Sequence, residues 1–136
     1  VVVATDTPRI VDVVRTAGGE AVLTDPNHPS GSDRIHEALM TLDPEGRHDA
    51  VINLQGDIPT LDPALIRRVL EPLADKAVDI ATLAARITRD EEHADPAVVK
   101  PVLSFVSEGR ARALYFTRAT APAGDGPRYH HIGIYA

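Results

Sequence analysis

The chain lacks three features whose absence narrows its possible functions. It has no cysteine, which excludes disulfides and thiolate metal sites. It has no apolar run near the roughly 20 residues that span a bilayer, so we expect a cytoplasmic protein. It also has no excess of basic residues: with a net charge of −6 it does not resemble a sequence-independent nucleic-acid binder, which needs a basic face. A nucleotide remains possible, because a metal ion, a few cations and backbone N–H groups can hold its phosphates.

Length and composition favour one domain or part of one. The chain has 136 residues, of which 43% are hydrophobic and 25% charged, as in ordinary globular proteins. Residues 1–4 begin inside an apolar strand pattern, and residues 131–136 stop inside another. We therefore expect residues 1–136 to be part of a single domain that is truncated at both ends.

Strand and helix patterns alternate in the first half of the chain. The apolar strand patterns fall at residues 1–4, 21–23 and 51–54. Helical apolar spacing follows each of them, at residues 8–17, 32–42 and 63–73. Thr7 before Pro8, and Asp62 before Pro63, are typical of helix starts. Short connections between such elements predict an α/β fold with a doubly wound, mostly parallel sheet that carries helices on both faces.

The pattern changes after this half. Strand patterns fall at residues 80–85, 98–106 and 111–116, and residues 89–93 form at most a short helix. Glu108-Gly109 predicts a hairpin turn between the last two strands. The segment 117–129 is rich in glycine and proline and predicts a loop. We therefore expect a hairpin excursion from the main sheet.

Asp57 is the first candidate for chemistry. It ends the turn Gln55-Gly56-Asp57 that follows a predicted strand, and ligands of open α/β sheets bind beyond the carboxyl ends of the strands. Mg²⁺ is usually held by one or two carboxylates plus substrate phosphates, so one aspartate is a sufficient first contribution. Gly-Asp is also ordinary turn chemistry, and the residues alone leave both interpretations open.

A second polar loop opens the helix predicted at residues 32–42. It supplies hydroxyls, a small residue, a carboxylate and a cation through Ser30, Gly31, Ser32, Asp33 and Arg34. Free N–H groups at a helix start favour an acceptor-rich ligand such as a nucleotide. Taken alone, the loop is better interpreted as a capping sequence with Arg34 on a solvated face.

Three more charged residues have weaker claims. Asp6 ends the first strand at the same sheet edge, but a cap for the next helix is its better interpretation. Arg118 enters the loop at 117–129 and could bind an acidic substrate in bidentate fashion, with a plain surface role equally open. Lys100 could be a site cation, although surface placement is the default.

Two histidines near the end of the chain suggest a binding surface rather than a metal pair. His130 and His131 are adjacent on a predicted strand, so their side chains point to opposite faces and cannot easily chelate one ion. One of them directed inward as a hydrogen-bond donor is the better interpretation. Tyr135 lies four residues after His131 and shares its strand face.

The order of these motifs is more specific than any one of them. Val-Ala-Thr-Asp, His-Pro-Ser-Gly-Ser-Asp-Arg, Asn-Leu-Gln-Gly-Asp and Asp-Pro-Ala-Val-Val-Lys follow one another, and Ala-Leu-Tyr-Phe-Thr-Arg-Ala and His-Ile-Gly-Ile-Tyr come next. In this order the chain resembles the sugar-nucleotide cytidylyltransferases, and within them the enzymes that act on 3-deoxy-manno-octulosonate (KDO).

The resemblance implies an enzyme that transfers a cytidylyl group from CTP to KDO, giving CMP-KDO and pyrophosphate for lipopolysaccharide synthesis. It implies Mg²⁺ as cofactor, held by Asp57, and a homodimer without nucleic-acid or membrane partners. The implied nucleotide contacts are Ser30, Gly31, Ser32, Asp33, Arg34 and Gln55. The implied sugar contacts are Arg118, His131 and Tyr135, with Asp57 and Arg118 as the catalytic residues.

The resemblance also bears on the fold and on completeness. It implies a Rossmann-like nucleotidyltransferase sheet within one nucleotide-diphospho-sugar transferase-like domain, of which residues 1–136 are part. The family's N-terminal phosphate-binding loop and a second metal-binding aspartate fall outside these residues, so we expect the segment to be inactive alone. A cytidylyltransferase for another acid sugar, such as N-acetylneuraminate, and a non-catalytic nucleotide-binding α/β module are the alternatives.

Overall fold

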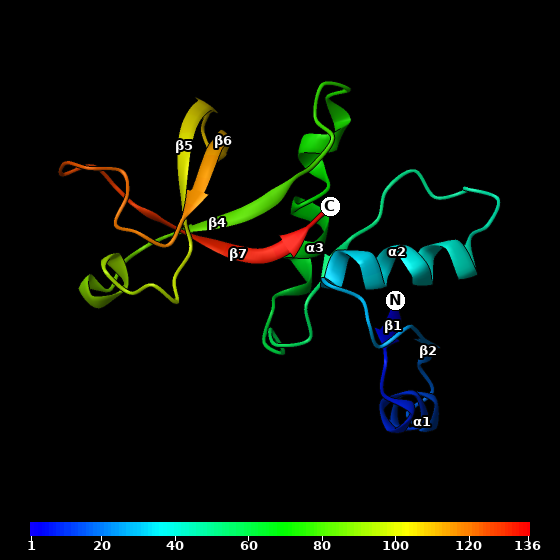
Figure 1. The fold of residues 1–136 in the computed structure, drawn as a ribbon. Helices are drawn as coiled ribbons and strands as arrows, with labels where there is room; N and C mark the ends of the chain where they lie inside the picture. The colour runs from blue at the N-terminus through cyan, green and yellow to red at the C-terminus, as the bar shows by residue number, and fades with distance from the viewer. The chain divides into compact units, whose positions relative to one another are not determined.

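The computed structural model describes all of residues 1–136 and divides them into two compact units, Val1–Asn53 and Leu54–Ala136. Helices and strands alternate in the first unit, and strands dominate the second (Figure 1). The predicted α/β class is therefore confirmed. None of the helices has both the length and the apolar character needed to cross a membrane.

The first unit is a strand-helix-strand frame with one further helix. Its elements are β1 (Val2–Thr5), α1 (Pro8–Thr16), β2 (Glu20–Leu23) and α2 (Gly31–Leu42). The two strands pair in parallel, from Val2 with Glu20 to Thr5 with Leu23. The pairing continues one step further, since the N–H of Thr24 donates to the carbonyl of Thr5 at 2.9 Å. Both strands therefore end at the same edge.

Local signals explain where α1 begins and ends. Thr7 is its N-cap, in extended conformation, and Pro8 takes a first-turn position where its missing N–H costs nothing. After the cap residue Ala17 the chain leaves the helix through Gly18, whose φ of 81° suits glycine. Val11 anchors the helix, with 6% of its surface exposed. The predicted start and stop of this helix are confirmed.

Asp43 closes α2 with a buried carboxylate. It is 3% exposed and accepts hydrogen bonds from the backbone N–H groups of Arg47 (3.0 Å) and His48 (2.8 Å). The His48 ring adds a contact at 2.6 Å. These donors, the Arg47 N–H first, lower the pKa of Asp43 to about 2. The carboxylate therefore organises the loop that follows the helix.

The second unit contains two small sheets. One has the strand order β3-β7-β4, in which β4 and β7 are antiparallel. The other is the antiparallel hairpin of β5 and β6, turned at Gly109 with φ 69° as predicted. The strands are β3 (Asn53–Leu54), β4 (Thr82–Arg86), β5 (Lys100–Ser107), β6 (Arg110–Thr117) and β7 (Tyr129–Tyr135). The helical segments are α3 (Pro63–Arg68) and the 3₁₀ turns η1 (Glu71–Ala74) and η2 (Asp90–His93).

The grouping of the strands and the length of one helix complete the comparison with the predicted elements. The strands are grouped in three small sheets, of which the β1–β2 sheet is parallel. Strands joined by a tight turn, such as β5 and β6, can only pair antiparallel. The helix expected at 63–73 ends at Arg68, because Pro72 has no N–H to donate and its ring opposes the carbonyl four residues earlier.

The most deeply buried side chains of the second unit include a cation. Val69, Ile134 and Pro101 are almost wholly inaccessible, and Lys100 is 0% exposed. The expected surface placement of Lys100 is therefore wrong. Its ammonium is satisfied by backbone carbonyls, which is why it can be buried without a carboxylate beside it.

Candidate functional site

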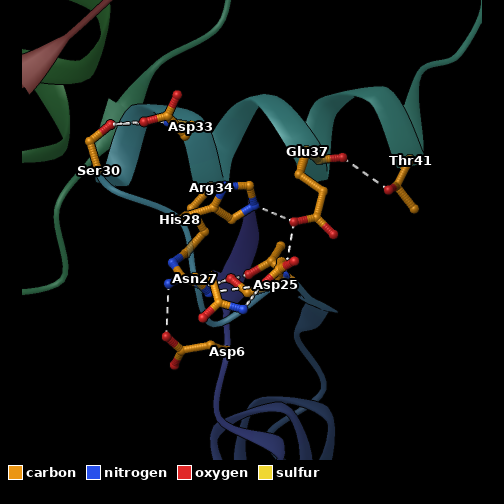
Figure 2. Close-up of polar contacts among 10 residues, drawn as sticks. Asp6, Asp25, Asn27, His28, Ser30, Asp33, Arg34, Glu37 and Thr41 are labelled. Carbon is orange, nitrogen blue, oxygen red and sulfur yellow. Dashed lines mark hydrogen bonds and ion pairs between the residues drawn. The ribbon is translucent and has the colours of Figure 1, made fainter.

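Arg34 of α2 reaches back to the ends of β1 and β2 (Figure 2). Its Nη2 donates to Oδ2 of Asp6 at 2.7 Å. Its Nη1 donates to Oγ1 of Thr24 at 2.6 Å and to the carbonyl of Asp25 at 3.2 Å. The side chain is 18% exposed, so its expected place on a solvated face is wrong. Asp6 is not a helix cap either, because Arg34 and the hydroxyl of Thr7 occupy its carboxylate.

Glu37 follows one helical turn after Arg34 and binds the same loop. Its Oε2 accepts the N–H of Asp25 at 2.9 Å and contacts Nε2 of His28 (Figure 2). The hydrogen bond from His28, and then that from Asp25, lower the pKa of Glu37. Neither His28 nor Glu37 was assigned a role from the sequence. The available signal was the spacing of Arg34 and Glu37, which puts both on one helix face.

The start of α2 is both capped and open. Oγ of Ser30 accepts the N–H of Asp33 at 3.3 Å, and the Asp33 carboxylate accepts the Ser30 hydroxyl, which confirms the capping interpretation. A Cβ added at Gly31 would meet nothing within 4 Å. The N–H groups of Gly31 and Ser32 have no partner within a helix. An acceptor-rich ligand can therefore approach the backbone here while Ser30 maintains the cap.

The turn of Gln55, Gly56 and Asp57 is exposed and follows β3. No group of three or more His, Asp or Glu side chains in the structure is placed to hold a metal ion. Asp57 thus offers a lone carboxylate, which fits an Mg²⁺ that is also held by substrate phosphates, and does not fit an ion held by protein alone. The Gln55 amide lies 3.8–4.0 Å from where a Cβ of Gly133 would stand.

His131 and Tyr135 lie together on β7, as their spacing predicted. Their ring centroids are 5.2 Å apart, and the ring of Phe116 meets that of His131 at 4.9 Å. Because Gly133 lies between them in the strand, Gln55 approaches the same stretch of β7. No hydrogen bond or ion pair joins Asp57 to these residues. The structure therefore brings Gln55, His131 and Tyr135 together at β7 and does not join Asp57 to them.

Thr82 fixes the proton position on His131. The Thr82 hydroxyl lies 2.8 Å from Nε2 of His131 and 2.6 Å from the carbonyl of Ile134. A carbonyl can only accept, so the hydroxyl donates to Ile134 and accepts the N–H of the imidazole. Burial, and then the charge of His130, lower the pKa of His131. The ring is therefore a neutral imidazole protonated at Nε2, with Nδ1 as an acceptor.

Arg118 is held by one nitrogen of its guanidinium. Its Nη1 donates to the carbonyls of Pro96 (2.8 Å) and Ala97 (3.3 Å). The remaining donors on Nη2 and Nε are free of protein partners and lie in one plane. This is the edge of an arginine that binds a carboxylate in bidentate fashion. Arg118 is exposed, so an anion can reach it.

A family model described as cytidylyltransferase matches residues 1–135. The chain belongs to the cytidylyltransferase family. Among its relatives, the 3-deoxy-manno-octulosonate cytidylyltransferase of Methylobacterium nodulans (strain LMG 21967) is 65% identical over all 136 residues, which cover 55% of that protein. The corresponding enzyme of Rhodopseudomonas palustris (strain HaA2) is 66% identical, with 56% covered. The chain thus spans a little over half the length of these cytidylyltransferases.

A solved cytidylyltransferase also resembles the chain in three dimensions. It is CMP:2-keto-3-deoxy-manno-octonic acid synthetase complexed with CTP, which is 36% identical to the chain. The TM-score is 0.85, with 98% of this chain and 54% of that chain covered. The family resemblance drawn from the motif order is therefore confirmed.

Proposed function

We propose that the whole protein transfers a cytidylyl group from CTP to KDO, releasing pyrophosphate and giving CMP-KDO for lipopolysaccharide synthesis. The observation that carries this proposal is the 65% identity over all 136 residues to a 3-deoxy-manno-octulosonate cytidylyltransferase. Because the chain covers 55% of that relative, we assign the activity to the whole protein and expect residues 1–136 to be inactive alone.

CTP would bind at the start of α2 in the first unit, and Gln55 of the second unit is a further nucleotide contact that the family resemblance implies. The open space at Gly31 and the unpaired first-turn N–H groups support this position, since they favour phosphate, ribose or base acceptors. Ser30, Ser32 and Asp33 would line it. The solved relative is complexed with CTP, which supports the choice of nucleotide.

Asp57 would supply a carboxylate oxygen to an Mg²⁺ that comes with the nucleotide. When bound, the ion would neutralise phosphate charge and orient the leaving pyrophosphate. The lone carboxylate in an exposed turn supports a site completed by phosphates rather than a preformed cage. A second carboxylate for the same ion is expected from residues outside this chain.

The sugar acid would lie against Arg118, His131 and Tyr135. The free Nη2 and Nε edge of Arg118 suits the sugar carboxylate, and holding it would keep the attacking anomeric hydroxyl in place. His131 would offer Nδ1 as an acceptor to a sugar hydroxyl, because Nε2 is bonded to Thr82. The chain's own contribution would then be positioning and charge, as in other phosphoryl transfers.

The finer architecture belongs to the whole protein. We propose that the strands are parts of one doubly wound, Rossmann-like sheet, mostly parallel, within one nucleotide-diphospho-sugar transferase-like domain. We also propose a cytoplasmic homodimer. Support for self-association comes from the β5–β6 hairpin, whose large apolar side chains are about half exposed or more at Phe105 (53%), Val106 (65%), Leu114 (58%), Tyr115 (55%) and Phe116 (46%).

Pyrophosphate release by the whole protein with CTP tests the function. We expect Mg²⁺-dependent release with KDO and little with N-acetylneuraminate. Asp57→Asn should lower turnover at least ~100-fold, since losing a direct ligand should exceed the roughly 10–100-fold cost of losing an outer partner. Asp79→Asn, which removes an exposed carboxylate without partners from the same unit, is the matched control.

The other outcomes separate the alternatives. Full Mg²⁺-dependent turnover in Asp57→Asn would refute the role of Asp57. A preference for N-acetylneuraminate would identify the enzyme as a cytidylyltransferase for that sugar. CTP binding without turnover on either sugar would favour a non-catalytic nucleotide-binding module.

A further inference from the structure

We propose, on the basis of the cytidylyl transfer proposed above, that Arg34 and Glu37 form a clamp that fixes the loop of residues 24–30. Both would be positioning residues for the nucleotide site: they hold the backbone that leads into Ser30 and Gly31 and do not touch CTP themselves. The inference follows from the hydrogen bonds that α2 makes to this loop.

The peptide groups of Asp25 are held from both sides. Its carbonyl accepts from Nη1 of Arg34 at 3.2 Å, and its N–H donates to Oε2 of Glu37 at 2.9 Å (Figure 2). Arg34 and Glu37 are one turn apart on the same helix face, so the helix fixes the distance between the two side chains that bind Asp25. The loop therefore has one favoured path past the helix.

Two further contacts extend the clamp along the loop. The Oγ1 of Thr24, at the β2 end, accepts a hydrogen bond from Nη1 of Arg34 at 2.6 Å. His28, two residues before Ser30, contacts Glu37. Between them, Asp25 folds the loop on itself by accepting the N–H of Asn27 at 2.8 Å. The loop is thus held by hydrogen bonds at Thr24, at Asp25 and at His28, just before the helix cap.

The contacts of Arg34 argue for this indirect role. Both terminal nitrogens already donate, and Nη2 is paired with the Asp6 carboxylate at 2.7 Å. Three of the five guanidinium N–H donors are engaged by Thr24, Asp25 and Asp6, so most of the hydrogen-bonding capacity of Arg34 is spent on the loop and on the β1 end. The family resemblance implies that Arg34 contacts the nucleotide. Its hydrogen bonds instead point to a role in holding the loop that leads to the proposed nucleotide site.

Fixing the loop beforehand should act on CTP affinity. A free loop would lose conformational entropy each time it closed on the nucleotide, and a preorganised one has already lost it. The loop would contact CTP equally in the ground state and the transition state. Weakening the clamp should therefore raise KM for CTP and leave kcat nearly unchanged.

The test uses Glu37→Ala, Glu37→Gln and Arg34→Lys in the whole protein. Losing hydrogen bonds to a charged group should raise KM for CTP about 10-fold in Glu37→Ala, with kcat within about 3-fold of wild type. Glu37→Gln keeps one acceptor oxygen and should rescue part of the effect. Lysine cannot reproduce the arginine fork, so Arg34→Lys should also raise KM.

Arg89→Lys and Glu92→Gln are the matched controls. Arg89 and Glu92 form another ion pair at three-residue spacing, and both belong to the second unit. These variants should keep the wild-type KM. Hydrogen exchange of the peptide covering residues 24–31, measured without substrates, should be faster in Glu37→Ala than in wild type.

Each outcome bears on the clamp or on the function separately. An inactive wild type would refute the cytidylyl transfer, while hydrogen exchange would still report on the clamp. With an active wild type, unchanged KM and exchange in Glu37→Ala would overturn the clamp. A fall in kcat at constant KM, or a lower Tm with no change in KM, would overturn the positioning role. If Glu37→Ala does not fold, Glu37→Gln and Arg34→Lys decide.

Discussion

The ammonium of Lys100 donates a hydrogen bond of 3.3 Å to the carbonyl of Arg118. The same Nζ donates to the carbonyl of Asp95 at 2.5 Å, and the lysine is wholly buried. The guanidinium of Arg118 bonds in turn to the carbonyls of Pro96 and Ala97. Two cations therefore cross-link residues 95–97 to the chain where it leaves β6, and Lys100 fixes the backbone from which Arg118 projects.

Lys100→Met should destabilise the protein. Methionine fills similar volume but leaves the carbonyls of Asp95 and Arg118 without their donor, and one buried unsatisfied group costs about 1–3 kcal/mol. Urea unfolding of the whole protein measures the loss. Lys76→Met, at an exposed lysine without hydrogen bonds, should unfold like wild type. Equal unfolding of Lys100→Met and Lys76→Met would mean that the buried ammonium adds nothing.

Arg118→Lys should impair use of the sugar acid more than use of CTP. Lysine keeps the charge but cannot present the Nη2 and Nε pair to a carboxylate. We expect KM for KDO to rise about 10-fold, the effect of losing one charge-assisted hydrogen bond, and KM for CTP to stay near the wild-type value. Arg112→Lys, on the strand β6 that leads to Arg118, exposed and without partners, is the control. A rise in both KM values alike would argue against a sugar contact.

Gly133 should tolerate alanine and reject valine. An added Cβ would lie 3.8 Å from the Gln55 side chain, which is ordinary van der Waals contact, so Gly133→Ala should keep the wild-type KM for CTP. The larger side chain of Gly133→Val would displace Gln55 and should raise that KM. Steady-state kinetics of the two variants provide the comparison. A normal KM in the valine variant would show that Gln55 does not contribute to nucleotide binding.

Asp43 should make stability depend on pH in the acid range. Its folded pKa of about 2 lies below the ordinary 3.8, so between these values the unfolded chain binds more protons. The stability that Asp43 adds is complete above pH 3.8 and is lost as the pH falls towards 2. The difference in unfolding free energy between wild type and Asp43→Asn should shrink over this window. A constant difference in guanidinium titrations from about pH 2 to pH 5 would contradict the shifted carboxyl.

The features predicted correctly from the sequence depend on neighbouring residues. Thr7 and Pro8 mark the start of α1, and Ser30 caps α2, because the residues that begin a helix lie within its first turn. His131 and Tyr135 share a face because strand geometry repeats every two residues. The end of α3 at Arg68 could also have been predicted, because Pro72 lies four positions later and cannot donate a hydrogen bond to its carbonyl.

The features that were missed depend on distant partners. The sequence predicts a solvated Arg34 because its partner Asp6 lies 28 positions away, and no local pattern indicates that pairing. Lys100 was placed at the surface because its acceptors are backbone carbonyls, and every residue type has one. The division into small sheets depends likewise on which strand edges meet, and apolar periodicity does not encode that choice.

The parallel pair of β1 and β2 has a consequence for the order of assembly. Only α1 and its turns separate the two strands, so little chain entropy is lost in closing them. The bond between Thr82 and His131, by contrast, spans 49 positions. Pulse-labelled hydrogen exchange during refolding should therefore protect β1 and β2 before β7, and simultaneous protection would disprove this order. A chain emerging from the ribosome can shape the loop at Asp25 before the strand that carries His131 has been synthesised.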